Sequence, residues 1–254
     1  MQKRRVADME VVVAHGLSKT YSTDSIEVKA LQEISFDIDA GSFLAFVGPS
    51  GSGKTTLLNL IGCLDKPTNG NLAVAGVDVV QLDRRQAAEF RGQNIGFIFQ
   101  SFNLIPVLTA FENVEYPLVM VQELPVAERR NRVLTLLNAV GMLEQRDHLP
   151  EQISGGQKQR VAIARALVTQ PKLVLADEPT ANLDHETAYM ILRLMKRMRD
   201  NFGTTFIFST HDTRIIGEAE IVYTLEDGRL VQREERGKAN VQSTKDRGAK
   251  LTAI

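Results

Sequence analysis

Apolar residues occur along this chain in short runs that are separated by polar stretches of varied length. Residues 43–47 and 173–176 are uninterrupted apolar runs, which are typical of strands buried on both faces of a sheet. Residues 34–38 alternate apolar with polar side chains, which indicates a strand with one face toward solvent. Further strands are expected at residues 11–13, 71–80, 95–99, 205–209, 221–225 and 230–231. Turns are expected at Asn69-Gly70, Gly76 and Asp227-Gly228, the last inside a hairpin.

Amphipathic stretches lie between these strands. In residues 126–140 the apolar side chains recur at helical spacing. Helices are also expected at residues 55–64, 161–167 and 188–198. Because strands alternate with helices, the pattern predicts an α/β fold. The helical character of residues 108–168 predicts a second lobe that is inserted into the sheet domain.

Composition narrows the classes of protein to which the chain can belong. It has 254 residues, 43% of them hydrophobic, which is enough for a sizeable core. The formal net charge of -1 disfavours a general nucleic-acid-binding protein, and no nucleic-acid partner is expected. A single cysteine, Cys63, is incompatible with an internal disulfide framework. The charged, aperiodic residues 234–254 are expected to form a flexible polar tail.

Membrane and targeting signals are missing from the hydrophobic pattern. No stretch approaches the roughly 18 uninterrupted apolar residues of a membrane span. The basic first residues are not followed by the apolar core of a secretory signal. We therefore expect a cytoplasmic protein that reaches any membrane through a partner.

A phosphate-binding motif follows the apolar run at 43–47. Residues 48–55 fit the pattern G-x-x-x-x-G-K-[ST] between a predicted strand and a predicted helix. The glycines let backbone N–H groups converge on phosphate oxygens, and the helix start adds partial positive charge. Lys54 would contact the β- and γ-phosphates, and the Thr55 hydroxyl would bind Mg²⁺. The residues expected to bind the nucleotide are Gly48, Pro49, Ser50, Gly51, Ser52, Gly53, Lys54, Thr55 and Thr56.

Two acids end the apolar run at 173–176. Asp177 is expected to hold Mg²⁺ through water, and Glu178 to orient and deprotonate the water that attacks the γ-phosphate. Pro179 is expected to keep Glu178 extended. An acidic pair can also simply end a strand, but the phosphate-binding motif favours the catalytic interpretation. Gln100 and His211 also follow predicted strands, although either residue alone is more typical of an ordinary surface loop.

A second helix start of the anion-binding kind lies at Ser154, Gly155, Gly156 and Gln157. It combines a Ser N-cap with two glycines before a long helix. One nucleotide does not need two such sites from the same chain. If the second start does not fold onto the first, it is expected to serve a nucleotide held by another copy.

Together these motifs closely resemble the ABC ATPase family, in the family's order and at its spacings, over residues 11–233. The resemblance implies the ABC ATPase fold, a P-loop NTPase core of the RecA type with an antiparallel β subdomain and an inserted α-helical subdomain. The core and β subdomain are expected in residues 1–107 and 169–233, and the helical subdomain in about 108–168.

The resemblance also implies roles for single residues. Two copies are expected to form a head-to-tail homodimer around two ATP molecules, each bound by the phosphate loop of one copy and the signature at Ser154 of the other. Tyr21 matches the aromatic residue that stacks on adenine, although composition alone favours a core position for it. Gln100 senses Mg²⁺ and nucleotide, His211 contacts the γ-phosphate, and Asp184 communicates across the dimer.

Three segments resemble the lipoprotein-releasing and macrolide-exporter branch of the family, namely residues 97–104, 108–118 and 176–184. The departures are Ala181 in place of Gly and Ile153 in place of Leu. This resemblance implies a motor on the inner face of the cell membrane that drives a membrane permease. Export or periplasmic extraction of lipoprotein, lipid, peptide or drug is the expected work.

Other classes of ABC protein remain as alternatives. One is a non-transporting motor that acts through a membrane partner on cell-envelope enzymes. DNA-repair and translation proteins of the family are disfavoured, because the segment between Gln100 and Ser154 lacks sustained heptads and the chain has one cassette.

Overall fold

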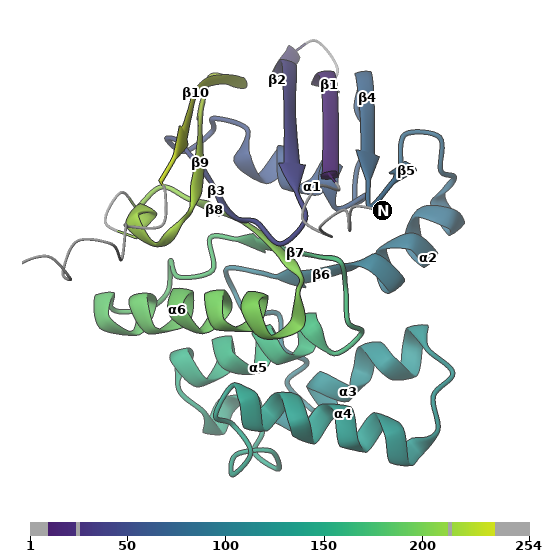
Figure 1. The fold of residues 1–254 in the computed structure, drawn as a ribbon, viewed down its shortest axis with the longest axis vertical. Helices are drawn as coiled ribbons and strands as arrows, with labels where there is room; N and C mark the ends of the chain where they lie inside the picture. The colour runs from purple at the N-terminus through teal and green to yellow at the C-terminus, as the bar shows by residue number, and fades with distance from the viewer. Residues whose placement is uncertain (1–9, 24–25, 213–214, 237–254) are drawn as a thin grey trace, which may run out of the picture.

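The computed structural model describes residues 10–23, 26–212 and 215–236, which form two sheets and a group of helices (Figure 1). None of the helices in these ranges combines the length and the apolar character that a membrane crossing needs. The α/β fold predicted from the alternation of strands and helices is confirmed.

The larger sheet has the strand order β10-β9-β3-β8-β7-β6. Its strands are β3 (Phe43–Val47), β6 (Ile95–Ile98), β7 (Leu173–Asp177), β8 (Thr205–Thr210), β9 (Ile221–Glu226) and β10 (Arg229–Glu235). All neighbouring pairs are parallel except β9 with β10. Parallel strands are covered on both faces, which explains why β3 and β8 are buried along their length and why β3 is apolar throughout. Because β10 continues to Glu235, the first two residues of the predicted polar tail belong to a strand. Residues 237–254 of that tail lie outside the described residues.

The smaller sheet is antiparallel, with the order β2-β1-β4-β5. Its strands are β1 (Glu10–Thr23), β2 (Ile26–Asp39), β4 (Asn69–Val74) and β5 (Val77–Asp78). The turn predicted at Gly76 is confirmed, because positive φ angles at Ala75 and Gly76 separate β4 from β5, although β5 ends at Asp78 before the predicted limit of residue 80. The turn predicted at Asn69-Gly70 is wrong. Asn69 pairs with Ser18 of β1, and glycine tolerates the φ of 92° that lets the strand continue.

Six α-helices are described: α1 (Lys54–Ile61), α2 (Arg84–Asn94), α3 (Ala110–Val121), α4 (Val126–Ala139), α5 (Gly155–Leu167) and α6 (His185–Phe202). Short 3-10 turns lie at Pro150–Gln152 and Ile216–Glu218. The apolar pattern did not predict α2 or α3, yet each begins with a capping box, at Asp83 and Thr109 respectively. In Figure 1, α3, α4 and α5 lie together on the side of the larger sheet away from the smaller one. The boundaries of the helical subdomain at 108 and 168 stay a prediction.

Hydrophobic cores cover both faces of the larger sheet. Alternate residues of β3 point to opposite faces, so Phe43 and Ala45 join a core with α6 and the helical group, while Leu44 and Phe46 join a core with α1 and the smaller sheet. Because a core packs on each face, the sheet is fixed from both sides, and the loops at its strand ends start from rigid positions.

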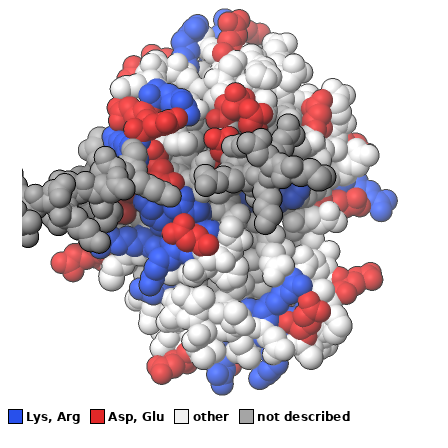
Figure 2. All heavy atoms as spheres, viewed as in Figure 1, with Lys and Arg blue, Asp and Glu red and all other residues white. Residues whose placement is uncertain are grey.

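Acidic and basic side chains lie interspersed over the surface seen in Figure 2.

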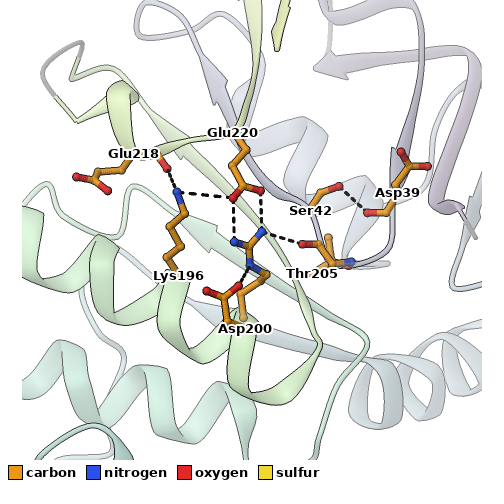
Figure 3. Close-up of polar contacts among 9 residues, drawn as sticks. Asp39, Ser42, Lys196, Asp200, Thr205, Glu218 and Glu220 are labelled. Carbon is orange, nitrogen blue, oxygen red and sulfur yellow. Dashed lines mark hydrogen bonds and ion pairs between the residues drawn. The ribbon is translucent and has the colours of Figure 1, made fainter. Parts of the chain in front are cut away.

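An ion-pair network attaches α6 to the end of the sheet where the parallel strands begin (Figure 3). The Arg199 guanidinium donates to both carboxylate oxygens of Glu220, at 2.7 and 2.9 Å, and to the carbonyl oxygen of Gly41 at 3.0 Å. Asp200 lies 2.7 Å from Nε of Arg199. Hydrogen bonding from Arg199 lowers the pKa of Glu220. Because Gly41 precedes β3 and Glu220 precedes β9, the network stabilises the strand ends opposite the phosphate loop.

Candidate functional site

The phosphate loop connects the carboxyl end of β3 to the start of α1. Its backbone conformation favours glycine at three positions, since Gly48, Gly51 and Gly53 have φ angles of 151°, 81° and 102°. A Cβ at Gly48 would lie 2.1 Å from the carbonyl oxygen of Leu225, and one at Gly53 would lie 2.5 Å from that of Ala30. The pattern of glycines in the motif is thus explained by backbone strain and by close packing of the loop on β9 and β2.

Lys54 is buried under this loop. Its Nζ donates to the carbonyl oxygens of Gly48 and Pro49 at 2.8 and 2.9 Å. Burial lowers the pKa of Lys54, and the negative charges of Glu178 and Asp177 oppose that shift. The buried Ser52 hydroxyl has no hydrogen-bond partner among the described residues. An ammonium group and an unpaired buried hydroxyl in one loop fit a phosphate ligand.

The end of β7 brings Asp177 to the phosphate loop, because only β8 separates β7 from β3. The Thr55 hydroxyl donates to the two carboxylate oxygens of Asp177 at 3.0 and 3.2 Å. A hydroxyl and a carboxylate are oxygen ligands of the kind that Mg²⁺ prefers. The residues present therefore fit the predicted magnesium site.

Ser209 on β8 connects both acids, and the sequence analysis missed it. Its hydroxyl donates to Oδ1 of Asp177 at 2.6 Å and accepts the backbone N–H of Glu178 at 2.9 Å. Ser209 is completely buried and pairs with Asp177 in the register of β7 and β8. A hydroxyl at the end of an apolar strand was the only signal for it in the sequence, and such residues are common.

Glu178 does not have the extended backbone that Pro179 predicted. Its φ is 45°, in the left-handed region. In this conformation, the N–H of Glu178 donates to the Ser209 hydroxyl. Its Oε1 lies 2.8 Å from Nδ1 of His211. These contacts offset the preference that proline imposes on the preceding residue. The structure thus brings Glu178 and His211 together beside a pocket of about 340 Å³.

Gln100 follows β6 and is exposed. Its carbonyl oxygen accepts a hydrogen bond from Nδ2 of Asn182 at 2.9 Å. Asp184, two residues further on, caps α6 by accepting the N–H of Thr187 at 3.0 Å, and hydrogen bonds from Thr187 lower the pKa of Asp184. The segment with Asp184 therefore contacts the Gln100 loop directly.

Ser154 and Gln157 form a capping box at the start of α5. The N–H of Ser154 donates to Oε1 of Gln157 at 2.8 Å, and the N–H of Gln157 donates to the Ser154 hydroxyl at 3.3 Å. A Cβ at Gly156 would lie 2.8 Å from the Thr187 side chain, so glycine permits close packing on α6. A Cβ at Gly155 would make only an ordinary contact, 3.5 Å from the Leu183 side chain. This helix start is well formed and packs beside the start of α6.

Tyr21 lies on β1 with 39% of its surface exposed. Its hydroxyl donates to Oδ2 of Asp65 at 2.9 Å, and Nζ of Lys19 lies 4.8 Å from the ring centroid. Desolvation, followed by hydrogen bonding to Asp65, raises the pKa of Tyr21. The ring is held in place and remains accessible, contrary to the core position that composition alone favoured.

The sequence matches known proteins over most of its length. A family model described as "ABC transporter" matches residues 31–181. An uncharacterized ABC transporter ATP-binding protein of Thermotoga maritima is 44% identical over 219 residues, which are 86% of this chain and 93% of that protein. The macrolide export ATP-binding/permease protein MacB of Rhodopirellula baltica is 44% identical over 240 residues, 93% of this chain. The match spans only 34% of that longer protein.

Solved structures share the fold. The ATP-binding cassette MJ0796 of Methanocaldococcus jannaschii, described as a dimer in a post-hydrolysis state bound to ADP and Pi, superposes with a TM-score of 0.81 at 42% identity. That match covers 89% of this chain and 100% of the other. CbiO1 of Clostridium perfringens, described as part of the ABC transporter complex CbiONQ, has a TM-score of 0.81 at 30% identity. That match covers 89% of this chain and 88% of the CbiO1 chain. The expected ABC ATPase fold is confirmed by these neighbours.

Proposed function

The chain belongs to the ABC transporter family, and on this premise we propose that it is the motor subunit of a complex in which ATP hydrolysis drives a membrane permease. ATPase activity is a property of the family, and the similar cassette MJ0796 is described in a post-hydrolysis state with ADP and Pi. The chain binds and hydrolyses ATP, whereas the permease and the transported substrate are proposals.

One observation supports the catalytic part of this proposal most directly. The phosphate loop, through Thr55, touches Asp177, and the next residue, Glu178, touches His211. A phosphate-binding loop, oxygen ligands for Mg²⁺ and a carboxylate base thus meet at the carboxyl ends of adjacent parallel strands, where open α/β sheets bind ligands.

In the proposed mechanism, the backbone N–H groups of the loop from Ser50 to Thr56 bind the phosphates together with the side chain of Lys54, while Tyr21 stacks on adenine. Thr55, Gln100 and, through water, Asp177 would hold Mg²⁺, which would neutralise charge on the phosphates. Glu178 orients the attacking water and accepts its proton. His211 holds the Glu178 carboxylate through their hydrogen bond and contacts the γ-phosphate.

We propose that a second copy completes the site. The start of α5 at Ser154, Gly155, Gly156 and Gln157 packs against α6 and presents a capped helix N-terminus. Such a helix end stabilises anions. Two copies in head-to-tail arrangement would place each signature on the partner's γ-phosphate, and Asp184 would lie near the junction. The dimeric description of MJ0796 supports this arrangement.

A groove between β6, α3 and α5 is the proposed contact for the permease. Its volume is about 230 Å³, and its lining is mostly apolar. Exposed apolar side chains continue this surface along α3, with Tyr116 44%, Val119 56% and Met120 64% exposed. We place the subunit on the cytoplasmic face of the cell membrane. The MacB relatives, which are named for macrolide export, favour export as the work of the complex. We propose export or periplasmic extraction of a drug, peptide, lipid or lipoprotein.

Glu178→Gln tests the catalytic assignment. The amide keeps the size of the side chain and its contact with His211 but accepts no proton, so kcat for ATP should fall by about 100-fold or more with little change in KM. Glu186→Gln, an exposed acid on α6, is the matched control and should retain activity. An unchanged kcat in Glu178→Gln would show that another group is the base.

Ser154→Arg tests the shared site. A bulky cation at the start of α5 should block ATP-driven dimerisation, measured by light scattering of the Glu178→Gln background with ATP and Mg²⁺. Dimers that persist would contradict the head-to-tail arrangement. Co-purification of a membrane permease with the tagged chain, followed by stimulation of the ATPase in proteoliposomes, tests the transporter assignment.

A further inference from the structure

We propose that Arg165 is a positioning residue for ATP hydrolysis, which holds the loop after Gln100 against the helix that carries the signature. The inference rests on the proposed role of Gln100 in that reaction. Arg165 belongs to the last turn of α5, whereas the signature lies at the first turn of the same helix.

The guanidinium of Arg165 contacts this loop with two hydrogen bonds. Its NH1 group donates to the carbonyl oxygen of Asn103 at 2.5 Å, and its NH2 group donates to that of Phe102 at 2.7 Å. A basic residue at the end of a helix usually interacts with the last carbonyl groups of its own helix. Arg165 instead reaches a segment 62 residues away in the sequence.

The two acceptors belong to an unusual stretch of backbone. Phe102 and Asn103 have φ angles of 61° and 48°, so two successive residues other than glycine are left-handed. This conformation is unfavourable, above all for a bulky residue such as Phe102, and persists only where other contacts impose it. The planar guanidinium, with donors in a fixed fork, suits two neighbouring carbonyl oxygens.

Among the residues that the structure describes, no carboxylate forms an ion pair with the guanidinium of Arg165. Burial lowers the pKa of Arg165, and no carboxylate among the described residues opposes that shift. Placing a cation in such a position without a counter-charge is unfavourable. The groove that Arg165 lines is mostly apolar and includes Phe97 and Val121. The arginine is therefore best explained by what it does to the Gln100 loop.

Other contacts make the loop a connection between two motifs. Asn182 donates to the carbonyl oxygen of Gln100, which fixes the start of the loop. The Phe102 ring lies 3.9 Å from the position of a Cβ on Gly155, at the start of α5. The loop therefore touches α5 both near the signature and at Arg165. A displacement of α5 would move Gln100, and Arg165 also lines the groove proposed for the permease.

The test compares three variants of the full chain. Arg165→Met removes the donors and keeps the length of the side chain, and Arg165→Lys can reach only one of the two carbonyl groups. Arg160→Met is the matched control, because Arg160 also belongs to α5 but does not touch the Gln100 loop. Its NH1 group donates instead to the carbonyl oxygen of Val140, at the end of α4, at 2.9 Å. Thermal unfolding of each variant reports any general loss of stability.

Kinetics separate positioning from structure. Arg165→Met should lower kcat by about tenfold or more, with KM for ATP changed by less than about twofold, because misplacement of Gln100 affects the reacting groups rather than binding. The free Mg²⁺ concentration for half-maximal activity should rise. The kcat of Arg165→Lys should lie between those of wild type and Arg165→Met. The kcat of Arg160→Met should remain within about twofold of wild type.

Several results would overturn the proposal. The proposal is rejected if the kcat of Arg165→Met is unchanged, or if only its KM for ATP changes. It is also rejected if Arg165→Met and Arg160→Met lose equal amounts of kcat. If Arg165→Met does not fold, Arg165→Lys carries the test, and a kcat equal to that of wild type rejects the proposal.

Hydrogen exchange supplies a readout that does not depend on activity. In nucleotide-free protein, amides of residues 100–105 should exchange faster in Arg165→Met than in wild type and Arg160→Met, and equal exchange would reject the clamp. A wild-type chain that hydrolyses no ATP would contradict the proposed function instead. The exchange comparison would still decide whether Arg165 holds the loop.

Discussion

Replacement of Ser209 by alanine should damage both the stability and the activity of the protein. The Ser209 hydroxyl is completely buried between two acids of the site. It donates to Asp177 at 2.6 Å and accepts the N–H of Glu178 at 2.9 Å. Alanine removes both hydrogen bonds and leaves the rest of β8 unchanged, so the substitution isolates what this one oxygen atom contributes.

The structure sets the size of the effect. A hydrogen bond to a charged group contributes about 1.5–3 kcal/mol, and an orphaned buried N–H costs about 1–3 kcal/mol. Because Asp177 is partly exposed, water replaces part of the first contribution. We therefore expect the free energy of unfolding to fall by about 2–4 kcal/mol, or Tm by about 4–16 °C. Displacement of Glu178 should lower kcat by about 10- to 100-fold.

Chemical denaturation and steady-state ATPase assays test these expectations. Thr204→Val is the control, because the buried Thr204 hydroxyl donates to the carbonyl oxygen of Pro171 at 2.7 Å, just before β8 begins. Its loss should reduce stability by about 1 kcal/mol and leave kcat unchanged. If Ser209→Ala retained the kcat of the control, Ser209 would be a structural residue and our account of how the two acids are held would be refuted.

Two further predictions concern stability. Because Arg199 lowers the pKa of Glu220, the pair stabilises the fold above the pKa of the unfolded carboxyl group, near 4.5, and this stabilisation is lost as pH falls through the lower folded pKa. At pH 7 the free energy of unfolding of wild type should be about 1 kcal/mol higher than that of Glu220→Gln, after allowance for solvent screening. In strong acid the two free energies should be equal, as measured by urea unfolding across pH. A Cβ at Gly96 would lie 2.1 Å from the carbonyl oxygen of Ala166. Gly96→Ala should thus cost about 2 kcal/mol or more, whereas Gly217→Ala, with nothing within 4 Å, should cost almost nothing in the same assay.

Local patterns in the sequence predicted much of the fold. The uninterrupted apolar runs at 43–47 and 173–176 correspond to β3 and β7, and the alternation of strands and helices correctly predicted an α/β protein. The polar helix α2 was missed because apolar periodicity is weak in a helix that buries only Ala87 and Phe90. Its capping box at Asp83 was the better signal, and the same holds for Thr109 at the start of α3.

The site shows a similar division. The motif residues were identified from the sequence because each combines a residue type with a local setting, such as glycines between a strand and a helix. The role of Ser209 was not visible, since it depends on the pairing of β8 with β7. The left-handed backbone of Glu178 was likewise hidden, because contacts with Ser209 and His211 outweigh the local effect of Pro179.

The sequence by itself therefore predicted the motif residues, most of the strands and the helices other than α2 and α3. These features depend on interactions between residues close together along the chain. Only the tertiary structure decided that Thr55 touches Asp177, 122 residues away, that Ser209 connects the two acids, and that Arg165 reaches the Gln100 loop. These contacts follow from the strand order β3-β8-β7-β6 and from the packing of α5 on β6, which no local pattern specifies.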